Sequence, residues 1–250
     1  MPEITGVTAP FRQIAAHYRD EIFRGDLAPG DRFPQARLVA ERWGVSRATV
    51  DKALNLLRAE GLIRSAPGIG SEVLGPPAPL SSAAQRLDRG RRTGSSWGDG
   101  ERSDSHAARM VSAPADVAEV LGLRAGDRVI QRTRTYRDGH GVVAYSTSWI
   151  PGAFAQELPE LLRAERLTGG TSLDLIARQM GRRVAARQDT TAARLATDED
   201  ISHLELEPGT VAAVLVLSST FLDAHQQPLE YGVDVGAPGR TRTDTSDVAP

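Results

Sequence analysis

The chain has 250 residues and a formal net charge of −2, and 40% of its residues are apolar. This length predicts two domains, and no apolar run approaches the roughly 20 residues that a membrane-spanning helix needs. The first ten residues lack the basic and apolar pattern of a signal peptide, and cysteine is absent, which excludes disulfides and thiol chemistry. We therefore expect a cytoplasmic protein with no cofactor, whose binding of nucleic acid, if any, depends on a local basic patch.

Residues 10–74 predict three helices followed by a β-hairpin. The helices are indicated by apolar residues at three- and four-residue spacing, namely Phe11, Ile14, Ala15, Tyr18, Ile22 and Phe23, then Leu38, Val39 and Trp43, then Val50, Ala53, Leu54 and Leu57. Gly25 and Gly44 end the first two helices, and Ser46 is a suitable N-cap for the third. Two short strand-like runs, 62–64 and 71–74, flank the turn residues 67–70.

Residues 75–105 are rich in proline, glycine, serine and charge, which predicts a linker between two domains. Trp97 is the exception within it, because an aromatic side chain could dock this segment onto a neighbouring surface. Residues 237–250 predict a polar, frayed tail.

Residues 106–236 mix helical and strand patterns and contain a weak internal repeat. Residues 114–126 align with 197–209, and each copy predicts a short capped helix, a glycine turn and a strand, 129–136 or 211–222. Each strand continues through a polar turn into a second strand with a matching tyrosine, Tyr145 or Tyr231. A helix over 173–180, capped by Thr171 and Ser172, lies between the copies, and 183–195 is a further candidate strand. The fold class is α+β with an antiparallel sheet.

Three helices and a hairpin within about 65 residues form the plan of a winged helix-turn-helix. A short helix that follows a tight turn can enter the major groove with its N-terminal residues against base edges. Here that helix begins Ser46-Arg47-Ala48-Thr49, which presents two hydroxyls and a guanidinium. The alternative is a three-helix bundle with no role in DNA binding.

The segments 33–40, 45–50, 53–63 and 68–70 resemble the DNA-binding domain of the GntR family. The resemblance spans residues 11–74 and implies a regulator that binds double-stranded operator DNA. By position it implies contacts from Arg37 in the second helix and from Ser46, Arg47 and Thr49 in the recognition helix. Gly68 and Gly70 would shape the wing.

Two departures from this family pattern affect the DNA-contacting residues. Gln35-Ala36 replaces the usual Ser-Glu before Arg37, and Asp51 stands where many members carry a base-reading arginine. An aspartate loses that contact but can accept a hydrogen bond from a cytosine amino group. Lys52, the only lysine, either supplies the missing charge or is a solvated helix residue.

The second domain lacks the groups that an enzyme would need. Its histidines show no metal-ligand spacing, it has no lysine, and it contains no nucleophile elbow or phosphate loop. Instead the segments 126–134, 147–151, 171–173 and 228–231 resemble the UTRA effector-binding domain of the HutC subfamily of GntR regulators. That resemblance implies a chorismate-lyase-like sheet used to sense a small molecule.

The same resemblance implies an effector site formed by Arg132, Arg134, Thr171, Ser172 and Glu230. A helix N-terminus beside guanidinium groups is a sound anion site. The alternatives are that the two arginines lie on a solvated face and that Thr171 and Ser172 only cap a helix. Ser146, Asp174 and the closing strand 232–240 depart from relatives that bind sugar phosphates, which disfavours that ligand here.

Together these features predict a homodimeric repressor whose DNA affinity is controlled by a small-molecule effector. One alternative is a DNA-binding regulator whose sensor domain is vestigial and serves only dimerisation. A chorismate-lyase-like enzyme is the remaining and least favoured alternative.

Overall fold

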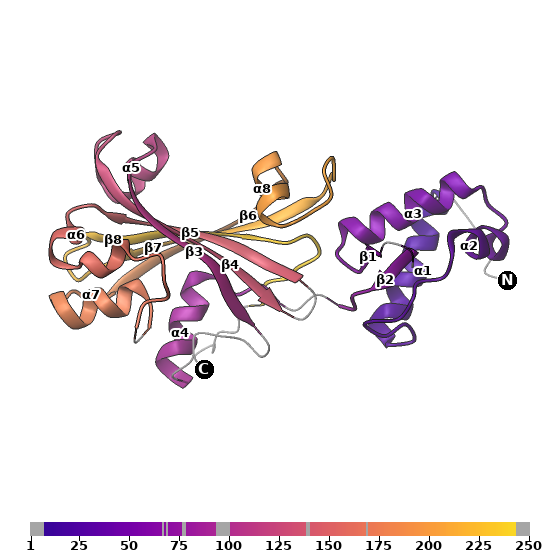
Figure 1. Cartoon of the computed structure of the whole chain (residues 1–250), viewed down its shortest axis with the longest axis horizontal. Coiled ribbons are helices and arrows are strands. Elements are labelled where there is room, and N and C mark those ends of the chain that lie inside the picture. Colours follow the sequence, from indigo (N-terminus) through magenta and orange to yellow (C-terminus); the bar gives the residue numbers. More distant parts are fainter. Residues whose placement is uncertain are drawn as a thin grey trace, which may run out of the picture. The chain divides into compact units, whose positions relative to one another are not determined.

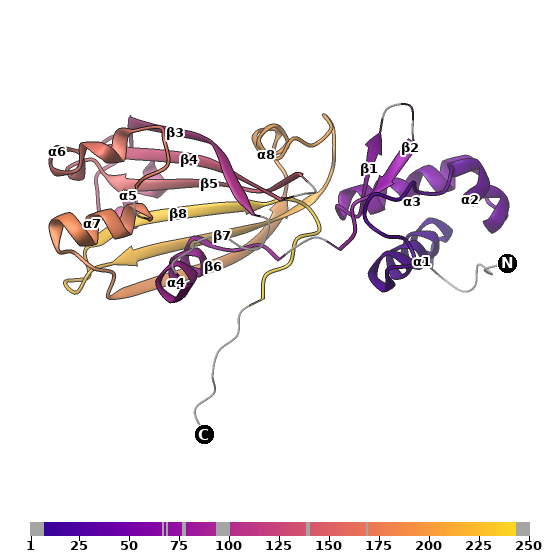
Figure 2. The same cartoon turned by 60° about the horizontal axis from the view of Figure 1, so that its bottom comes forward.

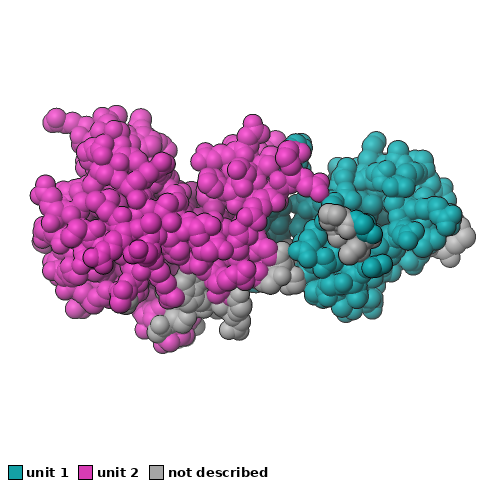
Figure 3. All heavy atoms as spheres, in the orientation of Figure 1, with its two compact units in different colours: residues 1–79, 209–214, 237–250 teal, residues 80–208, 215–236 magenta. Residues whose placement is uncertain are grey.

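The computed structural model describes residues 8–66, 68, 70–76, 79–93, 101–138, 141–168 and 170–243. The chain divides into two compact units, coloured separately in Figure 3. The N-terminal unit holds residues 1–79, 209–214 and 237–250, and the sheet unit holds 80–208 and 215–236. Among the described residues, no helix combines the length and the apolar character needed to cross a membrane.

The N-terminal unit has the three helices and the hairpin that the sequence predicts. The elements, labelled in Figure 1, are α1 (Pro10–Arg24), α2 (Ala36–Trp43), α3 (Arg47–Ala59), β1 (Ile63–Ala66) and β2 (Gly70–Val73). Left-handed glycines end α1 and α2, as expected from Gly25 and Gly44. The strands β1 and β2 pair antiparallel, with Ile63 opposite Val73.

The core of this unit contains most of the apolar residues that the helical patterns identify. Tyr18, Val50 and Leu57 are almost completely buried in it. Two residues are exceptions: Phe23 is 60% exposed and Leu38 is 48% exposed. The eight-residue helix α2 buries Val39 and Trp43, which are four positions apart and therefore lie on one face. Leu38 lies outside this narrow face and is turned away from the core.

The sheet unit contains a six-stranded sheet with the strand order β3-β4-β5-β8-β7-β6. The strands are β3 (Arg102–Ser112), β4 (Arg128–Asp138), β5 (Gly141–Pro151), β6 (Ala186–Leu195), β7 (Ala213–Leu222) and β8 (Pro228–Gly236). The predicted hairpins are the antiparallel pairs β4–β5 and β7–β8, and β5 pairs antiparallel with β8 at the centre. The predicted α+β class with an antiparallel sheet is confirmed.

The internal repeat is longer than the sequence pattern suggests. Its helices are α5 (Ala115–Leu121) and α8 (Asp198–His203), and each copy also begins with a strand, β3 or β6. The two copies, β3-α5-β4-β5 and β6-α8-β7-β8, occupy corresponding halves of the sheet. Neither edge strand has a regular apolar alternation, and for that reason β3 gave no signal in the sequence.

Helices cover both faces of the sheet. Figures 1 and 2 show α5 and α8 on one side, with α4 (Ala83–Thr93) and α7 (Ser172–Met180) on the other. The second side also carries α6 (Phe154–Glu157) and a 3-10 turn, Pro159–Leu162, and the apolar core beneath them includes Ile130 and Ile150. A pocket formed between this layer and the sheet is therefore lined by residues from both.

The segment expected to be a linker is in part structured. Leu80, Ala84 and Leu87 are at most 3% exposed and pack into the cores of the sheet unit, and α4 carries the last two. Because Leu80 precedes α4, the buried apolar side chains of the helix are only Ala84 and Leu87, a pattern too short to stand out from the surrounding proline, glycine and charge. Residues 102–105 belong to β3. Trp97 lies outside the described residues, as does the tail beyond residue 243, while 237–243 contains no helix or strand.

Candidate nucleic-acid interface and ligand pocket

The exposed start of α3 is the candidate recognition surface. Ser46 is the N-cap of α3, as predicted, and its hydroxyl accepts a hydrogen bond from the Thr49 backbone N–H at 3.2 Å. The Ser46 and Thr49 hydroxyls also lie 3.0 Å apart. Both side chains therefore shape the helix start as well as facing solvent at it.

The charges on this surface are largely paired. Arg47 donates from Nε to Asp51 at 3.1 Å, and Arg37 in α2 lies 3.7 Å from Glu41. These arginines are 69% and 75% exposed, so the pairs are weakly stabilising and can open toward another partner. Lys52 is also exposed, and within the described part of the chain it has no ion pair. The structure thus gives Asp51 a function that its sequence position did not show, which is to hold the side chain of Arg47.

The hairpin depends on its glycines for backbone conformation. Gly68 and Gly70 have φ of +74° and +100°, and a Cβ at either position would meet no atom within 4 Å. The requirement for glycine at these two positions is therefore conformational and not steric. Arg64 and Glu72 form a cross-strand ion pair at 2.9 Å beneath this turn.

The sheet unit has a polar pocket between β4, β8, α4 and the N-terminus of α7. Its volume is about 70 Å³, which is too small for a sugar phosphate in this conformation. The predicted effector residues all line it, and they are Arg132, Arg134, Thr171, Ser172 and Glu230. The structure therefore brings these five side chains together in one pocket.

Arg132 forms its hydrogen bonds with the protein backbone. Its guanidinium donates to the backbone carbonyls of Leu161, Arg163 and Glu165, and the side chain is 4% exposed. Burial lowers the pKa of Arg132, and the positive charge of nearby Arg134 lowers it further. The solvated-face alternative is wrong for Arg132, because the loop that follows the 3-10 turn covers it.

Arg134 has unused hydrogen-bonding capacity in the pocket. One terminal nitrogen donates to Ser148 Oγ at 3.1 Å, while its buried Nε has no partner among the described residues. His106 lies in the same pocket, where burial lowers its pKa and the charges of Arg134 and Arg132 add to the effect. The histidine is therefore neutral at pH 7 and leaves the arginines as the source of positive charge.

The N-terminus of α7 presents one hydroxyl to the pocket and uses the other for its cap. Thr171 and Asp174 form a capping box, so the cap reading of Thr171 is confirmed. Ser172 is 2% exposed and donates its hydroxyl proton to Glu230, which is 3% exposed. Glu230 therefore offers a carboxylate to the pocket next to a helix N-terminus.

Sequence reasoning missed the contribution of α4 to the pocket. Arg86, in the expected linker, lines the pocket and forms a buried ion pair with Asp234 of β8. Its guanidinium carbon lies 3.9 Å from the centre of the Tyr136 ring, and Tyr136 also lines the pocket. The described residues contain no group of three or more metal-ligating side chains.

Two family models cover most of the chain. The UTRA domain matches residues 100–241, and the bacterial regulatory proteins of the gntR family match residues 10–73. The chain belongs to the GntR family of regulators and carries a UTRA domain. This GntR-family protein is accordingly a DNA-binding transcriptional regulator with an effector-binding domain, and not an enzyme.

Named relatives match this regulator over most of both chains. It is 25% identical over 231 residues to the HTH-type transcriptional regulator GgaR of Escherichia coli (strain K12), a match that covers 90% of this chain and 86% of GgaR. It is 28% identical over 237 residues to the regulator PhnF of the same strain, covering 92% of each chain.

Solved structures have the same fold. One GntR-family transcriptional regulator is 25% identical with a TM-score of 0.55, and the match covers 96% of this chain and 98% of that one. PhnF from Mycobacterium smegmatis has a TM-score of 0.52 at 22% identity, covering 95% and 100%.

Proposed function

We propose that this GntR-family regulator is a homodimeric, cytoplasmic repressor that a small polar effector releases from its operator. Two winged helices related by the dimer axis would bind half-sites separated by about 10 base pairs or a multiple of that spacing. The effector would favour one arrangement of the two DNA-binding units and so shift operator occupancy. A regulator acts where the genome is, and this supports a cytoplasmic location.

The observation that carries the effector proposal is the unpartnered, buried Nε of Arg134. A buried donor without an acceptor costs free energy, which an acceptor on a ligand would recover. Besides Arg86, which is paired with Asp234, three arginines line the pocket. These are Arg132, Arg134 and Arg166, and Glu230 is the single carboxylate in the lining. We expect an effector with an anionic or strongly accepting group for Arg134 and a hydroxyl for Glu230.

The five predicted effector residues divide into two roles under this proposal. Arg134, Ser172 and Glu230 bind the effector directly. Arg132 contributes positive charge and positions the loop 161–165, and Thr171 fixes the N-terminus of α7 through its cap. Because the pocket holds only about 70 Å³, the effector must enlarge it by displacing one of its walls.

The DNA-contacting residues under this proposal are Arg37, Ser46, Arg47, Thr49 and Lys52, with Gly68 and Gly70 in the wing. The experiment is selection of binding sites from a randomised DNA pool, followed by titrations at several salt concentrations. Arg47→Ala is expected to cost about 1–3 kcal/mol and to relax one position of the selected site, while Lys52→Ala weakens all sequences and reduces the salt slope by about one. Unchanged affinity and sequence preference in Arg47→Ala would refute the recognition-helix assignment.

The effector proposal is tested by a thermal-shift screen of polar metabolites with the wild type and with Glu230→Gln. A ligand at 100 times its Kd stabilises the folded state by about 2.7 kcal/mol, and the substitution is expected to remove that stabilisation. Tight operator binding with no stabilising metabolite would favour the second candidate, a regulator whose sensor domain serves only dimerisation. Light scattering of the purified protein tests the dimer directly.

A further inference from the structure

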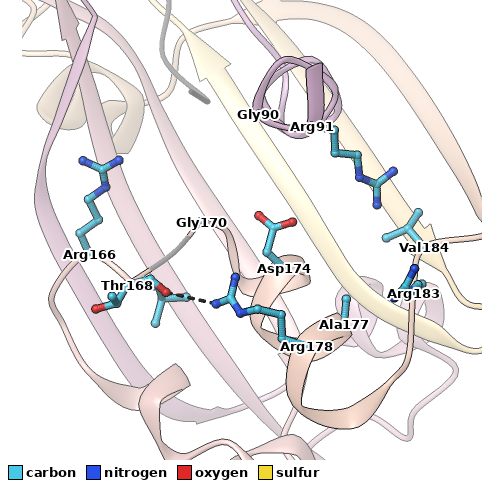
Figure 4. Close-up of a pocket in the computed structure, with 11 residues that line it drawn as sticks. Gly90, Arg91, Arg166, Thr168, Gly170, Asp174, Ala177, Arg178, Arg183 and Val184 are labelled. Carbon is cyan, nitrogen blue, oxygen red and sulfur yellow. Dashed lines mark hydrogen bonds between the residues drawn. The ribbon is translucent and has the colours of Figure 1, made fainter. Parts of the chain in front are cut away.

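A second and much larger cleft lies beside the effector pocket, which is the polar pocket lined by Arg134 and Glu230. The cleft is on the outer side of the described loop residues 166–168 and 170. Its volume is about 1010 Å³, and it is bounded by the end of α4, this loop, α7 and the segment that follows α7 (Figure 4). The effector pocket and the cleft share Arg166, Leu167 and Gly170, so the loop separates the two spaces.

The polar lining of this cleft is strongly one-sided in charge. Four arginines line it, namely Arg91, Arg166, Arg178 and Arg183, against the single carboxylate of Asp174. That carboxylate accepts from the backbone N–H of Thr171, at 2.8 Å, as part of the cap of α7. The cleft therefore has an excess of positive charge that its own acidic group does not offset.

Two of these arginines are available to a ligand. Arg91 and Arg183 are exposed, and neither has an ion pair or hydrogen bond within the described ranges. Figure 4 shows Arg91 extending from α4 toward Val184 and Arg183, across the opening from α7. Arg178 donates to the Thr168 carbonyl at 3.2 Å, which fixes the wall of the cleft. An anion bound in the cleft would supply the acceptors that these two guanidiniums lack.

Apolar side chains form part of the remaining lining, which completes a ligand-sized site. Leu167, Ala177 and Val184 contribute hydrocarbon surface among the arginines. A concave site lined by one sign of charge concentrates counter-ions, and a volume near 1000 Å³ accommodates a molecule of metabolite size. The positive charge and the volume of this cleft are both greater than a single inorganic anion requires.

We propose that this cleft is a second ligand site, specific for a phosphorylated metabolite with at least two negative charges, and separate from the effector pocket. Arg91 and Arg183 bind the charged groups from opposite sides, and the apolar residues contact the rest of the molecule. Since the cleft and the pocket share Arg166, Leu167 and Gly170, a ligand bound in the cleft restrains a wall that an effector must displace. Occupancy of one site therefore changes affinity at the other.

The test is calorimetric titration of the full-length protein with inorganic pyrophosphate, and with citrate as a polycarboxylate comparison. Arg91→Ser/Arg183→Ser is expected to weaken pyrophosphate binding at least tenfold without changing the thermal midpoint of the ligand-free protein. Arg109→Ser/Arg124→Ser is the matched control, because it removes the same charge from exposed positions outside the cleft and is expected to bind as the wild type does.

Four results would overturn the proposal. One is equal binding by the cleft variant and the surface control, which would place the anion elsewhere, such as on the DNA-binding surface. Another is loss of pyrophosphate binding in Arg134→Ser, which would assign the anion to the effector pocket. The third is the absence of saturable pyrophosphate binding in the wild type. The fourth is tighter binding of citrate than of pyrophosphate, which would replace the phosphorylated ligand by a polycarboxylate.

Discussion

Replacing Asp234 by asparagine tests how firmly α4 is attached to the sheet. Asp234 and Arg86 form an ion pair in which the side chains are 1% and 4% exposed, and Asp234 also accepts the Ala83 backbone N–H at 2.9 Å. Asparagine retains an acceptor but leaves the guanidinium of Arg86 buried without a counter-charge. Breaking a buried pair from one side costs about 3–5 kcal/mol, so α4 is expected to detach from β8 far more often.

Hydrogen–deuterium exchange of the α4 backbone measures this directly. Local opening free energies control amide exchange, and 3 kcal/mol corresponds to roughly a hundredfold faster exchange across residues 83–93. Asp88→Asn is the matched control on the same helix, because Asp88 pairs with Arg187 at 2.5 Å while 48% exposed. An exposed pair contributes about 0–1 kcal/mol, so exchange in this control is expected to rise about fivefold at most.

Equal amide exchange of α4 in Asp234→Asn and Asp88→Asn would show that the buried pair of Arg86 and Asp234 does not hold this helix on the sheet. A double variant, Arg86→Met with Asp234→Leu, distinguishes the charge effect from lost packing. Because no uncompensated charge is left in the interior, this variant is expected to exchange more slowly than Asp234→Asn. Faster exchange in the double variant would show that packing, and not charge, holds the helix.

Two further predictions concern the helix start at Ser46 and the buried carboxylate of Asp200. Ser46→Ala is expected to lower the unfolding free energy of the N-terminal unit by about 1 kcal/mol, whereas Ser46→Asp retains the cap and weakens only DNA binding; equal stability losses in urea titrations would contradict this. Asp200 is 1% exposed, and despite the opposing effect of burial, hydrogen bonds from Arg194, Tyr145 and Thr197 hold its pKa below the ordinary range. The contribution of ionised Asp200 to the unfolding free energy is therefore complete above about pH 4 and is lost as the pH falls toward the lowered pKa. Asp200→Asn is expected to lower the unfolding free energy by roughly 1–3 kcal/mol at pH 7 and by less at pH 3. A thermal-denaturation difference that does not narrow with acidification would contradict the pKa direction.

The helix-turn-helix could be predicted from the sequence because its signals are local. Apolar residues at helical spacing, glycines at helix ends and the Ser46 cap each act within a few positions of the chain. The same is true of the hairpins β4–β5 and β7–β8, where apolar strands flank polar turns. Leu38 was misplaced because spacing identifies a helical face but not how wide a face the neighbouring helices cover.

The pocket could be predicted only in part, and the resemblance to the UTRA domain supplied that part. It named five residues that share the pocket, but it did not indicate that Arg132 binds loop carbonyls or that Ser172 donates to Glu230. Those partners lie 31 and 58 positions apart in the chain. No local pattern encodes such a contact.

The sequence by itself determined the classes of element and the family, because periodicity, caps and motifs depend on neighbouring residues. Only the tertiary structure decided that residues 83–93 are a helix of the sheet unit, since their burial rests on an ion pair between Arg86 and Asp234, 148 positions apart. It alone brought Arg91 and Arg183 to one cleft from two distant segments. The net charge of a site depends on which distant residues folding brings together, so it cannot be counted from any one segment of the chain.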